Sequence, residues 1–292
     1  MRVAEWLGGG IAVFLVVAAL VYLFGSFALM ATSVSGPDRR AIRRTMVREC
    51  GYVLLTQPLI PLYFLVGRKL GRGDGVPVVF VHGYFQNRAD FCWLAWQFRR
   101  AGRGPLYGFN YPWFDTTVRN VARLARFVDG VCAETGSHRV ILVAHSLGGL
   151  ISLDYAASPR GRGRVTRCIT IGTPHAGVRW RGPIPGRVGK ELRAGSSFVA
   201  ARSQQMLTTP TLSVYSTLDN IVYPPSTSEL SGRGGRDIAI EGLGHLSLLY
   251  SAEVARVLLA FIDEGDLDDS DLDQGDRDQG DRDQGDAEPG RK

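Results

Sequence analysis

The stretch RVILVAHSLGGLISLDYAA, residues 139–157, carries the strongest indication of the fold. Its first part is a short run of apolar and β-branched residues, which is typical of a strand buried on both faces of a parallel sheet. Its second part, from Leu147 on, has the length and composition of a helix. Ser146 lies between the two parts, with the small residues Ala144 and Gly148 two positions to either side. The stretch therefore predicts a tight strand-to-helix turn that projects the Ser146 hydroxyl above the edge of the sheet.

The same alternation of short apolar runs and helix-length runs extends over residues 76–262. Strands are predicted at 76–83, 106–112, 139–146, 167–174, 211–217 and 237–242, and helices at 91–101, 117–135, 147–157 and 246–262. Buried strands that alternate with amphipathic helices are typical of α/β proteins, because each crossover helix covers one face of the sheet. We therefore predict an α/β fold with a mostly parallel sheet of about six strands and helices on both faces.

A serine hydroxyl is a weak nucleophile at neutral pH, so it needs a base, which in turn needs an acid to orient it. Asp219 follows the predicted strand at 211–217, and His245 follows the predicted strand at 237–242. The loops after parallel strands meet at one edge of the sheet, where the turn at Ser146 also lies. The sequence therefore predicts a catalytic triad of Ser146, Asp219 and His245. Glu241, four residues before His245, is the alternative acid.

An attacking serine also needs backbone N–H groups that stabilise the oxyanion formed during the reaction. One is predicted at Leu147, the residue after the serine, at the start of a helix. The other is predicted at Tyr84, because Gly83 in the segment VHGYFQN lets the chain turn tightly just before it. The N–H of Phe85 is the neighbouring alternative.

Five segments resemble, in this order along the chain, motifs of the α/β-hydrolase superfamily and specifically of bacterial triacylglycerol lipases and esterases. They are FVHGY (80–84), AHSLGG (144–149), GTPH (172–175), STLDNIVYP (216–224) and GLGH (242–245). The resemblance covers residues 76–262 and departs from the superfamily pattern at Ala144, where glycine is more frequent. It implies hydrolysis of carboxylic esters by Ser146, Asp219 and His245, without a cofactor, and a lid or cap formed by residues 176–206.

The substrate is predicted to be an ester, and most simply a lipid acyl ester, with Phe85, Trp113 and Phe114 lining its pocket. An acyltransferase, a thioesterase or an amidase would use the same triad, so these activities remain alternatives. An alternative from another class is a non-catalytic, membrane-tethered binding protein with a vestigial hydrolase fold, which the intact set of triad residues disfavours. The sequence does not indicate an oligomeric state.

The N-terminal segment is apolar enough to enter a membrane. No charged residue lies between Glu5 and Asp38, and residues 6–30 are almost wholly apolar. About 20 helical residues suffice to cross the hydrocarbon core of a bilayer. A cleaved signal peptide is the rival interpretation, but its basic region would contain only Arg2 and its best cleavage site is poor. We therefore predict an uncleaved transmembrane helix within residues 1–34.

Residues 35–75 are predicted to be associated with the membrane. Five arginines lie in PDRRAIRRTMVRE (37–49), and the positive-inside rule places such a segment in the cytoplasm. A charge-free run, 50–67, follows, and Pro58 and Pro61 interrupt any helix there. The run either lies on the bilayer, crosses it, or packs on the domain as an apolar strap. If it lies on the bilayer, the catalytic domain at 76–262 stays cytoplasmic, whereas a run that crosses the bilayer would place the domain outside.

Charge divides the chain into two parts. Residues 263–292 contain 13 acidic and 4 basic residues in a repetitive sequence with almost no apolar side chains, so they are predicted to form a disordered tail. Residues 1–262 contain 15 acidic and 30 basic residues, which fits an anionic membrane surface, and no motif indicates nucleic-acid binding. The four cysteines are widely spaced and no histidine lies at ligand spacing from them, so no metal site is predicted.

Overall fold

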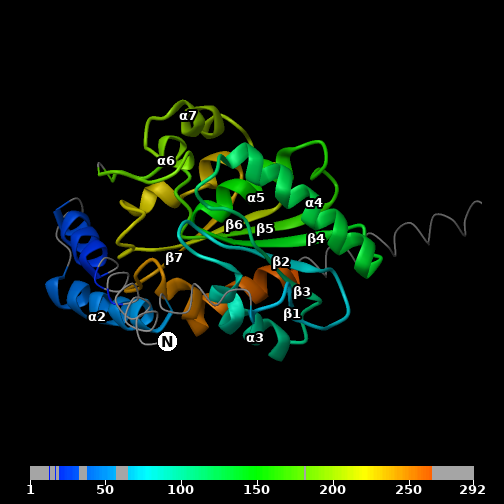
Figure 1. Cartoon of the computed structure of the whole chain (residues 1–292), viewed down its shortest axis with the longest axis horizontal. Coiled ribbons are helices and arrows are strands. Elements are labelled where there is room, and N and C mark those ends of the chain that lie inside the picture. Colours follow the sequence, from blue (N-terminus) through cyan, green and yellow to red (C-terminus); the bar gives the residue numbers. More distant parts are fainter. Residues whose placement is uncertain are drawn as a thin grey trace, which may run out of the picture.

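The computed structural model describes residues 13, 17, 20–32, 38–56, 65–180 and 182–264. Within them, a seven-stranded sheet crosses the centre of the molecule in the order β1-β3-β2-β4-β5-β6-β7 (Figure 1). The strands are β1 (Lys69–Gly71), β2 (Val78–Val81), β3 (Leu106–Phe109), β4 (Val140–His145), β5 (Val165–Ile171), β6 (Thr211–Ser216) and β7 (Arg236–Ile240). Strands β2 to β7 are parallel, and β1 pairs antiparallel with β3 at one edge. The predicted α/β fold with a mostly parallel sheet is confirmed.

Strand β1 adds one strand to the six that the sequence predicts. It comprises only Lys69, Leu70 and Gly71, so it has neither the length nor the apolar run that indicates a strand. Its backbone pairs with Leu106 and Tyr107 of β3. The segment is therefore extended because β3 offers it an unpaired edge, which is a tertiary effect.

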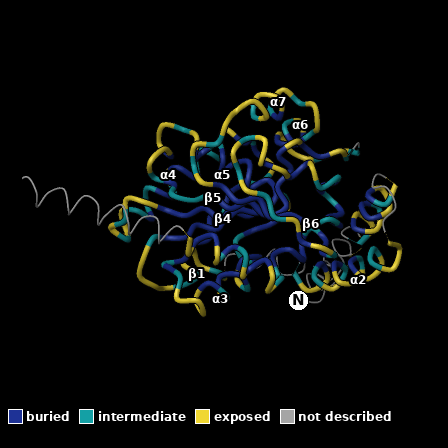
Figure 2. Tube along the Cα trace, turned by 180° about the vertical axis from the view of Figure 1, so that it is seen from behind, coloured by how far each residue is buried: buried dark blue, intermediate teal, exposed yellow. Residues whose placement is uncertain are grey.

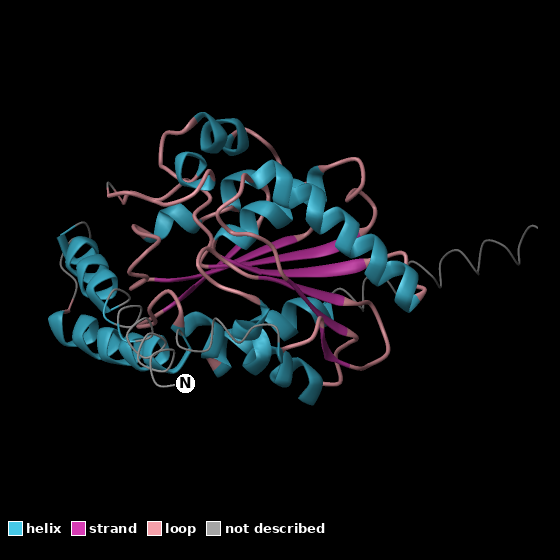
Figure 3. Cartoon of the chain, in the orientation of Figure 1, coloured by secondary structure: helices cyan, strands magenta, loops and turns pink. Residues whose placement is uncertain are grey.

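Helices cover both faces of the sheet (Figure 3). The described helices are α2 (Arg39–Thr56), α3 (Cys92–Arg100), α4 (Thr117–Thr135), α5 (Leu147–Ala157), α6 (Val188–Glu191), α7 (Ser197–Ser203), the helical segments 20–32 and 252–264, and the 3₁₀ turns η2 (Arg88–Phe91), η3 (Pro225–Ser228), η4 (Ser231–Arg233) and η5 (Ser247–Tyr250). Along β2, Val78 and Phe80 join the apolar cluster that includes α3 and 252–264, whereas Val79 and Val81 join the cluster that includes α4 and α5. This alternation buries the sheet on both faces, as Figure 2 shows.

The helices α4 and α5 have the predicted bounds. Helix α4 begins where the side chain of Thr116 accepts a hydrogen bond from the N–H of Arg119, and it ends at Gly136, which has a φ of 72°. The predicted helix 246–262 is wrong at its start, because the turn η5 and the helix 252–264 are separated by Ser251, whose backbone is extended. The hydroxyl of Ser251 accepts a hydrogen bond from the N–H of Val254, as an N-cap residue does, and this begins the second helix.

The two N-terminal helices pack against the body of the protein rather than standing apart from it. Leu23, Phe27 and Met30 of segment 20–32, and Val53 of α2, are buried in the same apolar cluster as Phe80 of the central sheet. Figure 1 shows both helices, in blue, beside one end of the sheet. These contacts place the N-terminal helices next to the loops that follow β6 and β7, as the hydrogen bonds described below establish.

Several sequence predictions fall wholly or partly outside the described residues. They concern residues 6–12, 14–16, 18 and 19 of the predicted transmembrane helix, the part of the charge-free run at 57–64, and the acidic tail beyond residue 264. Among the helices that the structure describes, none combines the length and the apolar composition needed to span a bilayer. Helix α2 joins the arginine-rich segment to the start of the charge-free run and ends at Thr56, two residues before Pro58.

Candidate active site

Ser146 lies in a strained turn at the carboxyl end of β4. Its backbone angles are φ 52° and ψ −124°, outside the regions that L residues ordinarily adopt. A Cβ atom on Gly148 would lie 2.3 Å from the carbonyl oxygen of Val81, so only glycine lets the start of α5 pack this closely on β2. The predicted strand-to-helix turn is therefore present, with β4 ending and α5 beginning on either side of Ser146.

Asp219 and His245 lie together at the same edge of the sheet, in the loops after β6 and β7. The Oδ2 atom of Asp219 is 2.8 Å from Nδ1 of His245. The Oδ1 atom accepts hydrogen bonds from the N–H groups of Ile221 and Val222, each at 2.8 Å, which fixes the orientation of the carboxylate. Asp219 is only 2% exposed, whereas Glu241, the alternative acid, is exposed. The carboxylate that contacts His245 is thus that of Asp219.

The surroundings of His245 act on its pKa in two directions. Burial lowers the pKa, because it disfavours the charged imidazolium. The carboxylate of Asp219 raises it through both its charge and its hydrogen bond, and the charge of Glu49 adds to this effect, so that the net pKa of His245 is raised. A base with a raised pKa accepts a proton from a hydroxyl more readily.

The end of β5 lies between Ser146 and the pair formed by Asp219 and His245. The N–H of Ser146 donates to the carbonyl oxygen of Ile171 at 2.9 Å. A Cβ atom on the next residue, Gly172, would lie 3.1 Å from Oδ2 of Asp219 and 3.3 Å from Nδ1 of His245. The structure describes all three predicted triad residues. Among them, a side-chain hydrogen bond joins Asp219 to His245, and none joins Ser146 to His245. Hydrogen bonds between a nucleophile and its base are often formed only when substrate binds.

The loop after β2 packs directly on the serine. A Cβ atom on Gly83 would lie 2.8 Å from the Cβ atom of Ser146, so glycine is required for this approach. The N–H of Gly83 donates to Oε1 of Gln86 at 2.8 Å, which leaves the N–H of Tyr84 as the next donor along the loop. The N–H of Leu147 belongs to the first turn of α5, where a helix has no acceptor of its own. The two predicted oxyanion donors thus belong to the two segments that adjoin Ser146, and their role stays a prediction.

His82 orders the backbone of this loop. Its Nδ1 lies 2.9 Å from the carbonyl oxygen of Gly83, and its ring stacks on Tyr111 with 4.2 Å between the ring centroids. The N–H of Tyr111 donates to Nε2 of His82 at 3.3 Å, which requires the neutral imidazole. Complete burial lowers the pKa of His82 to about 4, in agreement with this assignment.

The three predicted pocket residues form one aromatic group beside the loop. The ring of Trp113 lies 4.6 Å from that of Tyr84, 5.1 Å from that of Phe85 and 5.5 Å from that of Phe114, centroid to centroid. Phe85 is 45% exposed and Phe114 is 54% exposed. Phe85 also has a φ of 56°, so the alternative oxyanion donor is held in a strained conformation.

The segment predicted to be a lid contacts this aromatic group. Its carbonyl oxygen at Pro185 accepts a hydrogen bond from the hydroxyl of Tyr84 at 2.9 Å. The N–H of Arg187 donates to the carbonyl oxygen of Phe114 at 2.7 Å. Helices α6 and α7 follow within the same segment and lie above the sheet in Figure 1. Residues 185 and 187 are thus held against Tyr84 and Phe114, and the roles of 176–206 as a lid and of the aromatic group as a pocket stay predictions.

Comparison with known proteins agrees with this architecture. The sequence model of the alpha/beta hydrolase family matches residues 78–212. Similar solved structures include Aspergillus fumigatus lipase B (18% identity, 65% of this chain and 53% of that chain, TM-score 0.57) and the mature Bacillus licheniformis lipase BlEst2 (19% identity, 66% and 96%, TM-score 0.56). A third is an alpha/beta hydrolase enzyme from the sediment metagenome of the Mar Chica lagoon (20% identity, 67% and 94%, TM-score 0.50). The chain has the α/β-hydrolase fold. It spans about half the length of the Aspergillus lipase.

In this fold, three residues to which the sequence assigned no role surround the backbone of His245. The amide oxygen of Asn220 accepts a hydrogen bond from the N–H of His245 at 3.0 Å. Nε2 of His145 lies 3.1 Å from the carbonyl oxygen of His245, and the two rings are 4.5 Å apart. Glu49 contacts the two residues that follow. His145 and Asn220 lie within the quoted segments 144–149 and 216–224, next to Ser146 and Asp219, which is the only sequence signal for them, and Glu49 has none.

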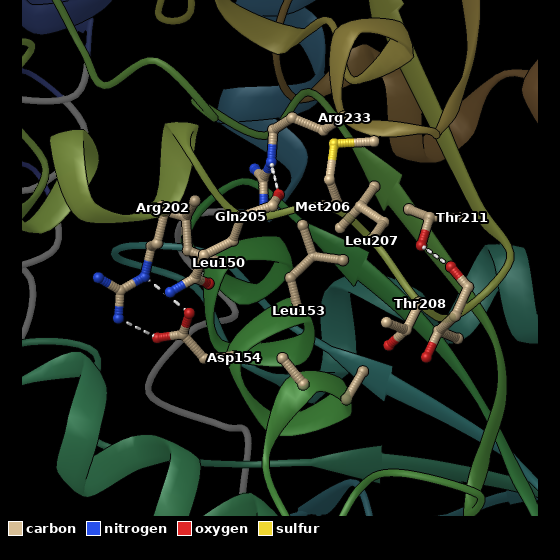
Figure 4. A pocket seen from close by; sticks show the side chains of 13 residues that line it. Leu150, Leu153, Asp154, Arg202, Gln205, Met206, Leu207, Thr208, Thr211 and Arg233 are labelled. Atoms are coloured by element: carbon tan, nitrogen blue, oxygen red, sulfur yellow. Dashed lines mark hydrogen bonds and ion pairs between the residues drawn. The ribbon is translucent and has the colours of Figure 1, made fainter.

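A small pocket elsewhere in the α/β-hydrolase fold does not belong to this site. It lies between α5 and the chain after α7, has a volume of about 30 Å³, and is lined by residues that include Leu150, Met206 and Arg233 (Figure 4). Asp154 and Arg202 form an ion pair at its rim. A volume of this size holds about one water molecule, so the pocket is too small for an ester substrate.

Proposed function

We propose that the protein is a serine hydrolase that cleaves carboxylic esters, and that its substrates are acyl lipids at a membrane surface. One observation carries the proposal: a serine in a strained strand-to-helix turn lies at the sheet edge where Asp219 and His245 are hydrogen-bonded to each other. Ser146 is the nucleophile, His245 the general base and Asp219 the acid that orients it. The match of residues 78–212 to the alpha/beta hydrolase family supports this class of reaction.

The reaction proceeds through an acyl-enzyme. His245 removes the proton from the hydroxyl of Ser146 as its oxygen attacks the ester carbonyl carbon. The negative oxygen of the tetrahedral intermediate accepts hydrogen bonds from the N–H groups of Tyr84 and Leu147. The imidazolium of His245, stabilised by Asp219, then donates its proton to the leaving alcohol. Water attacks the acyl group with His245 again as base, which releases the carboxylic acid and restores the serine.

The aromatic group beside the oxyanion loop supports an acyl chain as the bound part of the substrate. Trp113 contacts both Phe85 and Phe114, and these two rings are about half exposed. Exposed aromatic side chains supply apolar contact area to an acyl chain. They carry no charge, so binding the chain does not require a charged group to lose its water. The hydrogen bonds that join Tyr84 and Phe114 to residues 185 and 187 support a substrate whose entry depends on the lid segment.

We expect the purified full-length protein to hydrolyse p-nitrophenyl esters and to prefer the palmitate to the butyrate. A fluorophosphonate, which reacts with activated serines, should add one label per chain and stop hydrolysis. Peptide mass spectrometry would locate the label on Ser146. A label on a different serine, or hydrolysis that persists after complete labelling, would contradict the assignment of the nucleophile. A preference for the butyrate would contradict the long-chain part of the proposal alone.

The membrane part of the proposal rests on the exposed faces of the N-terminal helices. Val13, Val17, Val21 and Phe24 are each at least half exposed. Their spacing of four, four and three residues puts them on one face of a helix. Helix α2 adds five exposed arginines, Arg39, Arg40, Arg43, Arg44 and Arg48. An exposed apolar face and a group of exposed arginines fit the acyl region and the headgroups, respectively, of an anionic bilayer.

We expect the full-length protein to bind phosphatidylglycerol vesicles more strongly than phosphatidylcholine vesicles in a flotation assay. The double substitution Arg43→Glu and Arg44→Glu should weaken binding to the anionic vesicles by at least about tenfold, because each basic residue near such a surface contributes about 1 kcal/mol. The control Arg126→Glu changes an exposed arginine of α4, far from α2 in Figure 1, and should bind like the wild type. Equal binding by all three proteins would contradict the role of the arginines.

A further inference from the structure

Glu49 is a buried carboxylate that reaches from an N-terminal helix into the loop that carries His245. It lies in α2 and is 1% exposed. Its Oε2 atom accepts a hydrogen bond from the N–H of Ser247 at 2.9 Å, and its Oε1 atom accepts one from the N–H of Leu246. A Cβ atom on Gly244 would lie 2.5 Å from Oε2, so glycine permits this close approach. The carboxylate is thus in contact with the residues before and after His245.

The N–H groups of Leu246 and Ser247 have no hydrogen-bond acceptor within their own turn. Leu246 is the N-cap residue of the turn η5 and Ser247 is its first residue, and the first N–H groups of a helical turn have no partner within it. Burying a carboxylate is costly unless hydrogen bonds satisfy it. Burial raises the pKa of Glu49, and the hydrogen bonds from the N–H groups of Leu246 and Ser247 act against that rise. Because both of its oxygens accept hydrogen bonds from N–H groups, the geometry is that of an ionised carboxylate. Glu49 therefore acts as a cap for η5 that is supplied by a distant part of the chain.

A second N-terminal contact acts on the other side of His245. The hydroxyl of Ser26, in segment 20–32, accepts a hydrogen bond from the side-chain amide of Asn220 at 2.8 Å. The amide oxygen of Asn220 in turn accepts the N–H of His245 at 3.0 Å. Asn220 is 1% exposed and follows Asp219 directly. The N–H groups at positions 245, 246 and 247 are thus all held by groups that belong to, or are oriented by, the N-terminal helices.

We propose that Glu49 is a positioning residue for His245. It fixes the backbone that carries the catalytic base, so α2 contributes to catalysis by orienting that base. The inference rests on the proposed function, in which His245 transfers the proton. It assigns to the N-terminal helices a role in turnover that is separate from membrane attachment. A base must be held within a few tenths of an ångström of its productive place, because a displacement of about 1 Å can cost 100-fold in rate.

The charge of Glu49 gives the proposal a measurable signature. The charged or titratable groups that act on His245 are Asp219, Glu49 and the ring of His145. The negative charge of Glu49 favours the imidazolium and so raises the pKa of His245. Removing that charge lowers this pKa. Because protonated His245 cannot act as the base, the acidic limb of the pH profile of kcat/KM then moves to lower pH.

The test compares full-length Glu49→Gln with the wild type on a soluble p-nitrophenyl ester, well below the unfolding temperature of each protein. Glutamine keeps the shape but places an NH₂ group against one of the two N–H donors and removes the charge. We expect kcat to fall on the order of 10- to 100-fold with little change in KM, and the acidic limb to move to lower pH. Glu49→Asp retains the charge, so its acidic limb should stay near that of the wild type.

Val53→Ala is the matched control, because it weakens the apolar packing of the same helix and removes no hydrogen bond to the loop of His245. It should lower the unfolding temperature while leaving kcat and the pH profile of the folded enzyme unchanged. If Glu49→Gln behaves like Val53→Ala, Glu49 only stabilises the fold and the inference is overturned. If Ser146→Ala remains active, the proposed function fails instead, so the two failures can be told apart.

Discussion

Replacing Ser146 by alanine is expected to reduce kcat for a soluble ester on the order of 10⁴- to 10⁶-fold, with the fold retained. The substitution removes the atom that forms the acyl-enzyme, and nothing else in the described site offers a nucleophile activated by His245. Some hydrolysis above the uncatalysed rate should survive, because the oxyanion donors still bind the substrate. The measurement is the initial rate of p-nitrophenyl ester hydrolysis by the full-length variant, with its circular dichroism spectrum as the check on folding.

Ser152 offers a matched control for this substitution. It lies in the same helix that follows the nucleophile, is fully buried, and its hydroxyl has no hydrogen-bond partner within the described residues. Ser152→Ala removes an unsatisfied buried hydroxyl, so we expect unchanged kcat and equal or greater stability. A similar loss of activity in Ser146→Ala and Ser152→Ala would mean that disturbing α5, rather than removing a nucleophile, inactivates the enzyme.

Asp219→Asn is expected to reduce kcat on the order of 10⁴-fold. The carboxylate accepts the Nδ1 proton of His245 through Oδ2, whereas the N–H groups of Ile221 and Val222 occupy Oδ1. Asparagine keeps its carbonyl oxygen toward those two donors and turns its NH₂ group toward Nδ1. His245 is then held with Nδ1 as the acceptor and Nε2 protonated, which is the wrong tautomer for removing a proton from Ser146.

The pH profile gives a second measure of the same change. Asp219 raises the pKa of His245, so its loss should move the acidic limb of the residual activity to lower pH. Glu241→Gln is the control, because Glu241 is exposed and lies outside the pair. Its rate should stay within about twofold of the wild type, as exposed charges contribute little. A larger loss in Glu241→Gln than in Asp219→Asn would reassign the acid.

Local sequence patterns determined the order and type of most elements. Apolar runs in β2 to β7 and the amphipathic pattern of α4 are local signals, so these elements lie where they were predicted. The turn at Ser146 is equally local, since a buried strand, a serine between small residues and a helix occur within one short stretch. The placement of Asp219 and His245 followed from topology, because loops after parallel strands meet at one edge.

Tertiary contacts decided the remaining features. Strand β1 exists because β3 has a free edge. The break at Ser251 is instead local, because the side chain of Ser251 caps the helix that follows it. The choice between Asp219 and Glu241 depends on which carboxylate reaches Nδ1 across the gap between two loops. Spacing along the chain leaves that choice open, since both residues follow a strand that ends at the same edge.

Glu49 marks the limit of what the sequence by itself determined about this protein. The sequence determined an α/β sheet with a serine turn, an acid and a base at one edge, because short runs of residues carry those signals. It offered no sign that a glutamate in an arginine-rich N-terminal segment contacts the base loop 197 residues further along the chain. Such a contact is set by how the N-terminal helices pack on the finished fold, and a hydrogen bond between distant segments leaves no periodic pattern in either of them.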